Sequence, residues 1–130
     1  MIFVDTNVFM YSVGRAHPLK DPAREFFVES VRNQTRLYTS AEVLQELAYS
    51  YLPVNRRQTL EAALSLITRT GVEVWPLESE DVYLACRLHE QFPALGARDL
   101  CHLASCQRRG VAHIKTFDQA FAAAANNLAF

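Results

Sequence analysis

The sequence lacks the features that define several common classes of protein. Its three cysteines are an odd number without C-x-x-C spacing, which argues against a disulfide framework and predicts reduced thiols in a cytoplasmic protein. No apolar run approaches the roughly 20 residues of a membrane span, and the chain does not open with a charged segment and an apolar stretch, so we expect neither membrane insertion nor a signal peptide. A glycine-rich phosphate loop and a motif for a serine or cysteine nucleophile are also missing.

An excess of charge of one sign is missing as well. The chain has 13 Lys and Arg against 14 Asp and Glu, a formal net charge of −1, which alone does not predict a nucleic-acid-binding protein. If four acids were committed to a metal site, 13 basic residues would face 10 remaining acidic ones. A near-neutral total is therefore compatible with a basic surface around an acidic cavity.

The chain begins with an apolar run, Ile2–Val4, that stops at Asp5. Such a run predicts a strand buried on both faces. A carboxylate directly after a buried strand lies where the chain leaves the sheet, and open α/β sheets bind their ligands outside the carboxyl ends of their strands. The position of Asp5 therefore predicts a polar site at that edge of the sheet.

The 130 residues, of which 50% are hydrophobic, are expected to form one domain (1–130) with a substantial core. The patterning predicts strands at residues 2–4, 37–39, 72–75 and 111–114. It predicts helices at residues 6–11, 21–33, 40–52, 55–70, 79–91 and 98–109, and a short last helix after Asp118 in an alanine-rich tail that ends at Phe130. Asp21, which precedes Pro22, and Ser79 are the expected N-caps of their helices. Strands separated by helices predict a parallel sheet with helices on both faces.

Four acids are placed to meet at the carboxyl edge of this sheet. Asp5 follows the first strand, and Asp118 follows the fourth. Glu46 lies on the helix after the second strand, and Asp99 begins the helix before the fourth strand. Each aspartate alone also fits a helix N-cap worth about 1 kcal/mol, and the glutamate alone fits a solvated position. Together, four converging carboxylates repel one another unless a hard cation such as Mg²⁺ or Mn²⁺ neutralises them.

The segments that carry these acids resemble the PIN-domain nucleases, most closely the VapC-type toxins of prokaryotic toxin–antitoxin pairs. The matching segments are Ile2–Asn7, Ser40–Leu47, Ala97–Ala104 and Ile114–Asp118, in the family's order and across nearly the whole chain. The resemblance implies an α/β fold, a PIN-like three-layer α/β/α sandwich with a central parallel sheet of four to five strands.

The resemblance also implies a metal-dependent endoribonuclease. In the family, the acids at the positions of the four named above are catalytic and hold one or two Mg²⁺ or Mn²⁺ ions, which polarise the scissile phosphate and lower the pKa of a bound water. Thr6, Asn7 and Thr116 match polar positions that orient carboxylates, water or phosphate, although the same residues also fit helix caps. The implied partners are an RNA substrate, a cognate VapB-like antitoxin whose C-terminal arm covers the acidic pocket, and a second copy of the chain in a homodimer.

Several further polar residues allow two interpretations. Arg98 fits an RNA phosphate contact or a solvated helix start, and we favour the phosphate. His102 lies one helical turn after Asp99, where it is able to hydrogen-bond that carboxylate, but we favour a core or surface histidine. Surface charge is the default interpretation of the remaining candidate RNA contacts, which are Arg15, Lys20, Arg56, Arg57, Arg108, Arg109 and Lys115.

Other classes of protein fit the sequence less well. A phospho-acceptor receiver needs adjacent acids early in the chain, and a haloacid-dehalogenase-type phosphatase needs a second aspartate where Asn7 stands. Structural zinc is disfavoured because Cys101 and Cys106 lie about 140° apart around a helix. The remaining alternative is a non-catalytic PIN module that only binds RNA or protein, although such modules typically lose one or more of the acids.

Overall fold

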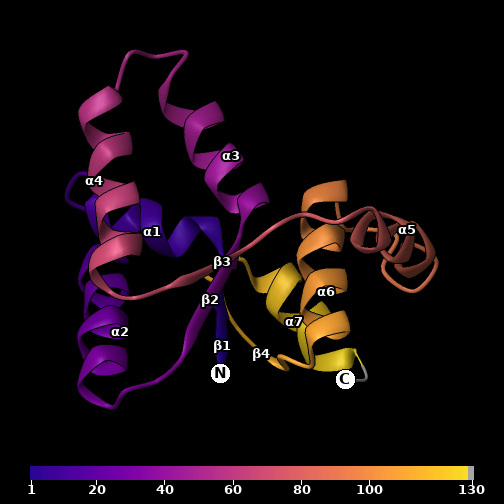
Figure 1. Ribbon diagram of the computed structural model, residues 1–130. Helices are drawn as coiled ribbons and strands as arrows, with labels where there is room; N and C mark the ends of the chain where they lie inside the picture. Colours follow the sequence, from indigo (N-terminus) through magenta and orange to yellow (C-terminus); the bar gives the residue numbers. More distant parts are fainter. Residues whose placement is uncertain (129–130) are drawn as a thin grey trace.

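A sheet of four parallel strands runs through the centre of the computed structural model, which describes residues 1–128 (Figure 1). The strands are β1 (Ile2–Val4), β2 (Leu37–Ser40), β3 (Glu73–Trp75) and β4 (His113–Lys115). Their spatial order is β3-β2-β1-β4, and every neighbouring pair is parallel. The predicted parallel sheet is confirmed, with four strands in the described part of the chain.

Helices cover both faces of this sheet. They are α1 (Thr6–Val13), α2 (Lys20–Arg32), α3 (Ala41–Tyr51), α4 (Arg57–Arg69), α5 (Ser79–Leu88), α6 (Ala97–Arg109) and α7 (Gln119–Asn127). Helices α1 to α4 enclose one hydrophobic core, and α5, α6 and α7 enclose a second on the other side of the sheet (Figure 1). The three-layer α/β/α arrangement is therefore confirmed.

No helix among residues 1–128 is both long enough and apolar enough to cross a membrane.

The pairing of β1 with β4 brings two polar segments side by side. Val4 lies opposite Lys115 in the ladder, and the backbone N–H of Asp5 donates to the carbonyl oxygen of Lys115 at 3.0 Å. Asp5 and Thr116 therefore leave adjacent strands at the same level of the sheet. Phe3 and Val4 have no exposed surface, which confirms a first strand buried on both faces.

The start of α2 lies earlier than predicted. The helix begins at Lys20 with Leu19 as its N-cap, whereas we expected Asp21 as N-cap and Pro22 as the first helical residue. The turn is already closed before Asp21, because the backbone N–H of Lys20 donates to the carbonyl of His17 at 3.0 Å. Pro22 is tolerated because N–H groups in the first turn have no partner within the helix.

Two further predicted boundaries are corrected. Glu78, not Ser79, is the N-cap of α5, and it forms a reciprocal capping box with Asp81. The fourth strand covers His113–Lys115 rather than 111–114, because His113 is the residue that pairs with Ile2. The end of the alanine-rich tail, residues 129–130, lies outside the described residues.

Candidate metal centre

Asp5 is the most enclosed acid at the carboxyl edge of the sheet, with 5% of its surface exposed. Its Oδ1 accepts a hydrogen bond from the backbone N–H of Thr6 at 2.7 Å. Its Oδ2 accepts one from Thr116 Oγ1 at 2.7 Å and one from Asn7 Nδ2 at 3.3 Å. Burial raises the pKa of Asp5 above its ordinary value, although the charge of His102 and these hydrogen bonds oppose the shift.

The structure places the three predicted polar residues directly against the acids. The Thr116 hydroxyl donates to Asp5 and accepts from the backbone N–H of Asp118 at 3.0 Å and from Asn7 Nδ2 at 3.2 Å. One donor and two acceptor positions are all that a hydroxyl offers, so its orientation is fixed. Thr6 Oγ1 donates to Glu46 Oε2 at 3.0 Å. These side chains therefore hold two of the four predicted acids in fixed orientations.

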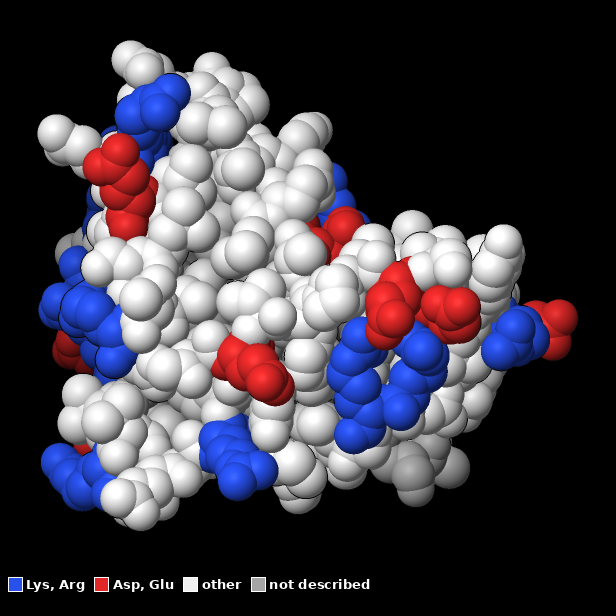
Figure 2. Space-filling view, in the orientation of Figure 1, with Lys and Arg blue, Asp and Glu red and all other residues white. Residues whose placement is uncertain are grey.

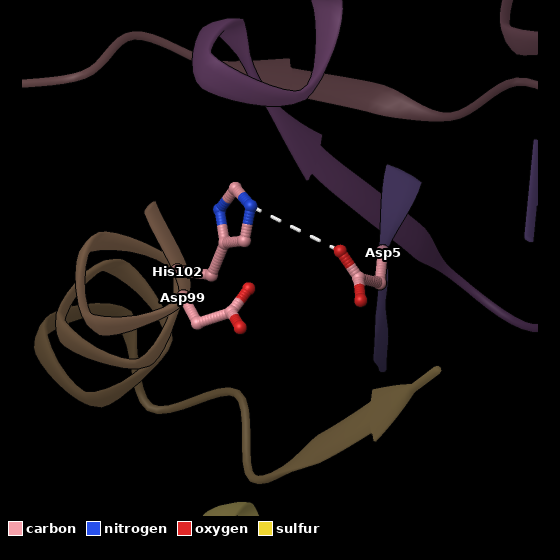
Figure 3. Close-up of side chains that lie close together, drawn as sticks. All are labelled: Asp5, Asp99 and His102. Carbon is pink, nitrogen blue, oxygen red and sulfur yellow. Dashed lines mark ion pairs between the residues drawn. The ribbon is translucent and has the colours of Figure 1, made fainter. Parts of the chain in front are cut away.

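Asp99 and His102 face Asp5 from α6. Figure 3 shows His102 and Asp5 extending toward each other, with Asp99 beside them on the same helix as His102. One ligand atom from each of the three residues lies within 4.8 Å of the others. His102 Nε2 is 3.9 Å from Asp5 Oδ1. This compact group joins residues from the first strand end and from a helix almost a hundred residues later.

The pKa of Asp99 reports crowding of negative charge at this centre. It is raised to about 6, first by burial and then by the charges of Asp5, Asp118 and Glu46, against the opposing charge of His102. Near pH 6 this carboxyl group is half protonated, and a bound cation would favour its ionised form. The surroundings of Asp99 thus favour binding of a cation.

Glu46 joins the compact group through His102. Its Oε1 lies 3.0 Å from His102 Nε2, and its Oε2 accepts from Thr6. Burial raises the pKa of Glu46, but the hydrogen bond and charge of His102, the Thr6 hydroxyl and the charge of Arg98 lower it further, so the net shift is downward. Glu46 is therefore ionised and acts only as an acceptor in these bonds.

Asp118 lies at the rim of the centre. Asp118 is exposed. Its Oδ1 accepts a hydrogen bond from the backbone N–H of Phe121 at 3.1 Å, so the carboxylate caps α7. Its charge still reaches the interior, since it contributes to the raised pKa of Asp99. Among the described residues, the compact three-residue group does not include Asp118. Asp118 therefore caps a helix and also lies close enough to the other acids to affect the pKa of Asp99.

His102 is the site residue whose place the sequence prediction missed. We left open whether it is a core or a surface histidine, and the structure makes it a core residue that is 1% exposed. The partner that we considered for its hydrogen bond, Asp99, is not the partner observed, which is Glu46. The one-turn spacing from Asp99 was the available signal. It places both side chains on one face of α6 but says nothing of Glu46, which is 56 residues away in the chain.

The basic side chains that are candidate RNA contacts differ in how many contacts they make within the protein. Arg98 is part-exposed, its Nε is 3.7 Å from Glu42 Oε1, and its guanidinium lies 5.0 Å from the Tyr49 ring centre. Lys115 lies next to Thr116, with its Nζ 4.9 Å from the centre of the Phe117 ring. The charge of Arg98 therefore reaches Glu46, whereas the Lys115 amine lies over the rings of Phe26 and Phe117.

Arg108 and Arg109, by contrast, belong to a structural ion-pair cluster between α5 and α6. Asp81 Oδ1 accepts from Arg108 Nη1 at 2.7 Å and from Arg109 Nη1 at 3.1 Å, and Glu78 Oε1 accepts from Arg109 Nη2 at 2.8 Å. Arg109 also lies over the Trp75 ring. Figure 2 shows basic and acidic side chains side by side over this part of the molecule. We expected solvated surface charge here by default, and the structure instead pairs both arginines with Asp81 and Glu78, which disfavours RNA contact.

The donors at the sheet edge fit a divalent cation. Two enclosed carboxylates converge from β1 and α6, and a third, from α3, is held beside them. Oxygen donors of this kind suit Mg²⁺ or Mn²⁺, and an imidazole nitrogen in the same group is a ligand type that transition metals also accept. A cation shared by these carboxylates would offset the repulsion that contributes to the raised pKa of Asp99.

Fold and centre together define a parallel α/β protein with a carboxylate-lined cation site at the carboxyl edge of its sheet. The model of the PIN domain family matches residues 2–127. The chain is also 60% identical over 124 residues to ribonuclease VapC23 of Mycobacterium tuberculosis, with 95% of this chain and 98% of that protein covered. The chain therefore belongs to the PIN-domain family and, within it, to the VapC proteins.

Solved structures show the same fold at much lower sequence identity. The crystal structure of Mycobacterium tuberculosis VapC20, described as a sarcin-ricin loop cleaving toxin, superposes with a TM-score of 0.78 at 22% identity, covering 95% of each chain. Rickettsia felis VapBC2, solved bound to a DNA fragment from its promoter, gives 0.73 at 19% identity, covering 93% of this chain and 91% of that one.

Proposed function

We propose that this protein is a metal-dependent endoribonuclease of the VapC type, which hydrolyses phosphodiester bonds in RNA and is neutralised by a cognate antitoxin. The observation that carries the proposal is the convergence of Asp5, Asp99 and Glu46 around His102 at the carboxyl edge of the sheet. The 60% identity to a protein named as a ribonuclease supports the same activity.

We assign the catalytic role and the binding of Mg²⁺ or Mn²⁺ to the four acids, Asp5, Glu46, Asp99 and Asp118. A cation bound there polarises the scissile phosphate and lowers the pKa of a bound water. Thr6, Asn7 and Thr116 keep the acids oriented, and Arg98 contacts a phosphate of the RNA from the exposed side of α6. The oxygen-rich donor set and the hydrogen bonds to Asp5 and Glu46 support these assignments.

The partners and setting follow from the same family. We propose a VapB-like antitoxin, supported by the structural similarity to Rickettsia felis VapBC2, and a homodimer of single PIN domains spanning residues 1–130. We place the protein in the cytoplasm, where its three free cysteines would stay reduced. The alternative, a PIN module that only binds RNA or protein, is disfavoured because all four acids are present.

Removal of metal tests the proposed activity most directly. We expect purified, antitoxin-free protein to cleave RNA in the presence of Mg²⁺ or Mn²⁺, to lose cleavage in excess EDTA, and to regain it when Mn²⁺ is added back. The measurement is the appearance of labelled RNA fragments on a denaturing gel. Cleavage that persists in EDTA would contradict a metal-dependent reaction, and metal binding without cleavage of any RNA would favour the non-catalytic module.

The raised pKa of Asp99 predicts that metal affinity depends on pH. Below about pH 6, Asp99 holds a proton that a cation must displace, so we expect the apparent affinity for Mn²⁺ to fall by up to about tenfold per pH unit. Above that value the carboxylate is ionised and the affinity should level off. Calorimetric titration between pH 5 and 8 measures the effect, with Asp99→Asn as the control that removes the proton. An affinity independent of pH in this range would contradict the role of Asp99.

The same shift predicts how the stability of the metal-free protein changes with pH. An acid whose folded pKa is raised binds its proton more tightly in the folded state. The stabilisation from protonated Asp99 is therefore complete below 3.8, its pKa in the unfolded chain, and is lost as the pH rises through about 6, its pKa in the folded protein. Added Mn²⁺ should restore stability at higher pH, because it binds the ionised form.

A further inference from the structure

His102 lies at the meeting point of the acids in a setting that fixes its position. The ring is 1% exposed and lies between two aromatic side chains, with its centre 5.3 Å from that of Phe3 and 6.1 Å from that of Phe121. Both neighbours are themselves fully buried. The imidazole therefore cannot swing out of the centre without opening the core.

The hydrogen bond to Glu46 makes Nε2 of the ring a donor. Glu46 is ionised and its oxygens only accept, so His102 Nε2, 3.0 Å from Oε1, is the donor. The second nitrogen, Nδ1, is buried without a hydrogen-bond partner. Among the described residues, the ring thus makes its hydrogen bond through Nε2.

Glu46 is held from both of its oxygens. His102 donates to Oε1 and the Thr6 hydroxyl donates to Oε2, so both carboxylate oxygens are held, and the charge of Glu46 acts on both Asp5 and Asp99. Each oxygen keeps a second lone pair that no described side chain uses. Thr6 is fixed by its place directly after Asp5. His102 supports Glu46 from α6, the helix that also carries Asp99.

We propose that His102 is a positioning residue whose Nε2–H fixes the Glu46 carboxylate beside Asp5 and Asp99, so that three acids from β1, α3 and α6 are set for one divalent cation. The inference rests on the proposed function for the site, but it concerns metal binding and can be tested without RNA. Loss of a residue that supports a metal ligand in this way typically lowers the metal affinity of a protein by about 10- to 100-fold.

Two variants separate the hydrogen bond from the packing of the ring. His102→Leu fills the buried position but removes the donor, and we expect the Kd for Mn²⁺ measured by calorimetry to rise by about 10- to 100-fold. His102→Gln keeps an N–H donor, and we expect its Kd to stay within about threefold of the wild type. His89→Gln, an exposed histidine at the end of α5, is the matched control. Equal losses in the Leu and Gln variants, with melting temperatures equal to the wild type, would overturn the proposal.

A double-mutant cycle tests whether His102 acts through Glu46. In a Glu46→Gln background the negative carboxylate is gone, so we expect His102→Leu to change the Kd for Mn²⁺ by less than about threefold there. The same fold-change in both backgrounds would overturn the proposal. So would a directly bonded nitrogen from His102 in the electron spin echo spectrum of bound Mn²⁺, because it would make His102 a ligand.

The outcomes also separate this inference from the proposed function. If the cycle behaves as expected but no RNA is cleaved, the proposed nuclease activity fails and the role of His102 stands. If RNA is cleaved and the affinity for Mn²⁺ is unchanged in His102→Leu, the role of His102 fails and the nuclease stands. If the wild-type protein binds no Mn²⁺, both fail.

Discussion

Replacement of Asp5 by Asn is expected to reduce RNA cleavage by about 10³-fold, the largest effect of any single substitution in the centre. Metal-ion catalysis supplies several kcal/mol of stabilisation to the transition state, and about 4 kcal/mol corresponds to a factor of about 10³ in rate. Of the four acids in the centre, Asp5 accepts the most hydrogen bonds from described residues, namely Thr6, Asn7 and Thr116, and the amide of Asn cannot replace its charge. Single-turnover cleavage of labelled RNA measures the loss.

The fold should survive this substitution. Burial raises the pKa of Asp5, which means that the folded protein carries its charge at a cost, and Asn removes that charge while keeping the shape. We therefore expect the free energy of unfolding without metal to stay within about 1 kcal/mol of the wild type. Asp21→Asn, at an exposed position in the first turn of α2, is the matched control and should cleave normally. Cleavage by Asp5→Asn within about tenfold of the wild type would refute the assigned role.

Replacement of Asp81 by Ala is expected to lower the free energy of unfolding by about 3 kcal/mol, the largest effect on stability that we predict. Asp81 has no exposed surface and receives hydrogen bonds from Arg108, Arg109 and the backbone N–H of Glu78. Loss of one partner of a buried ion pair leaves the other charges uncompensated, at a typical cost of about 3–5 kcal/mol, and the partial exposure of the two arginines places this case at the lower end. Urea denaturation measures the difference.

The dependence of this effect on pH follows from the pKa of Asp81. Burial raises it, but the Glu78 N–H and the two arginines lower it further, so the net shift is downward from 3.8. The stabilisation from ionised Asp81 is then complete above the pKa of Asp81 in the unfolded chain. It is lost as the pH falls through the lower pKa of Asp81 in the folded protein. Glu80→Ala, an exposed neighbour in the same turn of α5, should change stability by less than about 0.5 kcal/mol. A loss below about 1 kcal/mol in Asp81→Ala would contradict the structural role of the cluster.

The parallel sheet and its polar edge were predictable because they depend on local patterns. The run Ile2–Val4 followed by Asp5 is one pattern, and the parallel sheet follows from strands that alternate with helices. Once the sheet is parallel, Asp5 and Thr116 must leave it at one edge, and the structure places them in direct contact at 2.7 Å. Sequence reasoning thus reached the location of the centre and the acids around it.

Contacts between distant segments were not predictable in the same way. His102 has apolar neighbours on α6, so its pattern is that of a core residue, and its bond to Glu46 depends on how α6 packs beside α3. Asp81 lies in the first turn of a helix, where an acid is ordinarily exposed, and only Arg108 and Arg109 from another helix account for its burial. Both cases depend on which helices pack together, whereas periodicity in a single sequence shows only that a helix has a buried face.

The pairing of β1 with β4 has a consequence for the synthesis of the protein. The hydroxyl that holds Asp5 belongs to Thr116, which lies 111 residues later in the chain. Since chains are synthesised and begin to fold from the N-terminus, β1 is made well before the strand β4 that pairs with it. A chain that stops short of Thr116 therefore carries Asp5, Glu46 and Asp99 without the hydroxyl that holds Asp5.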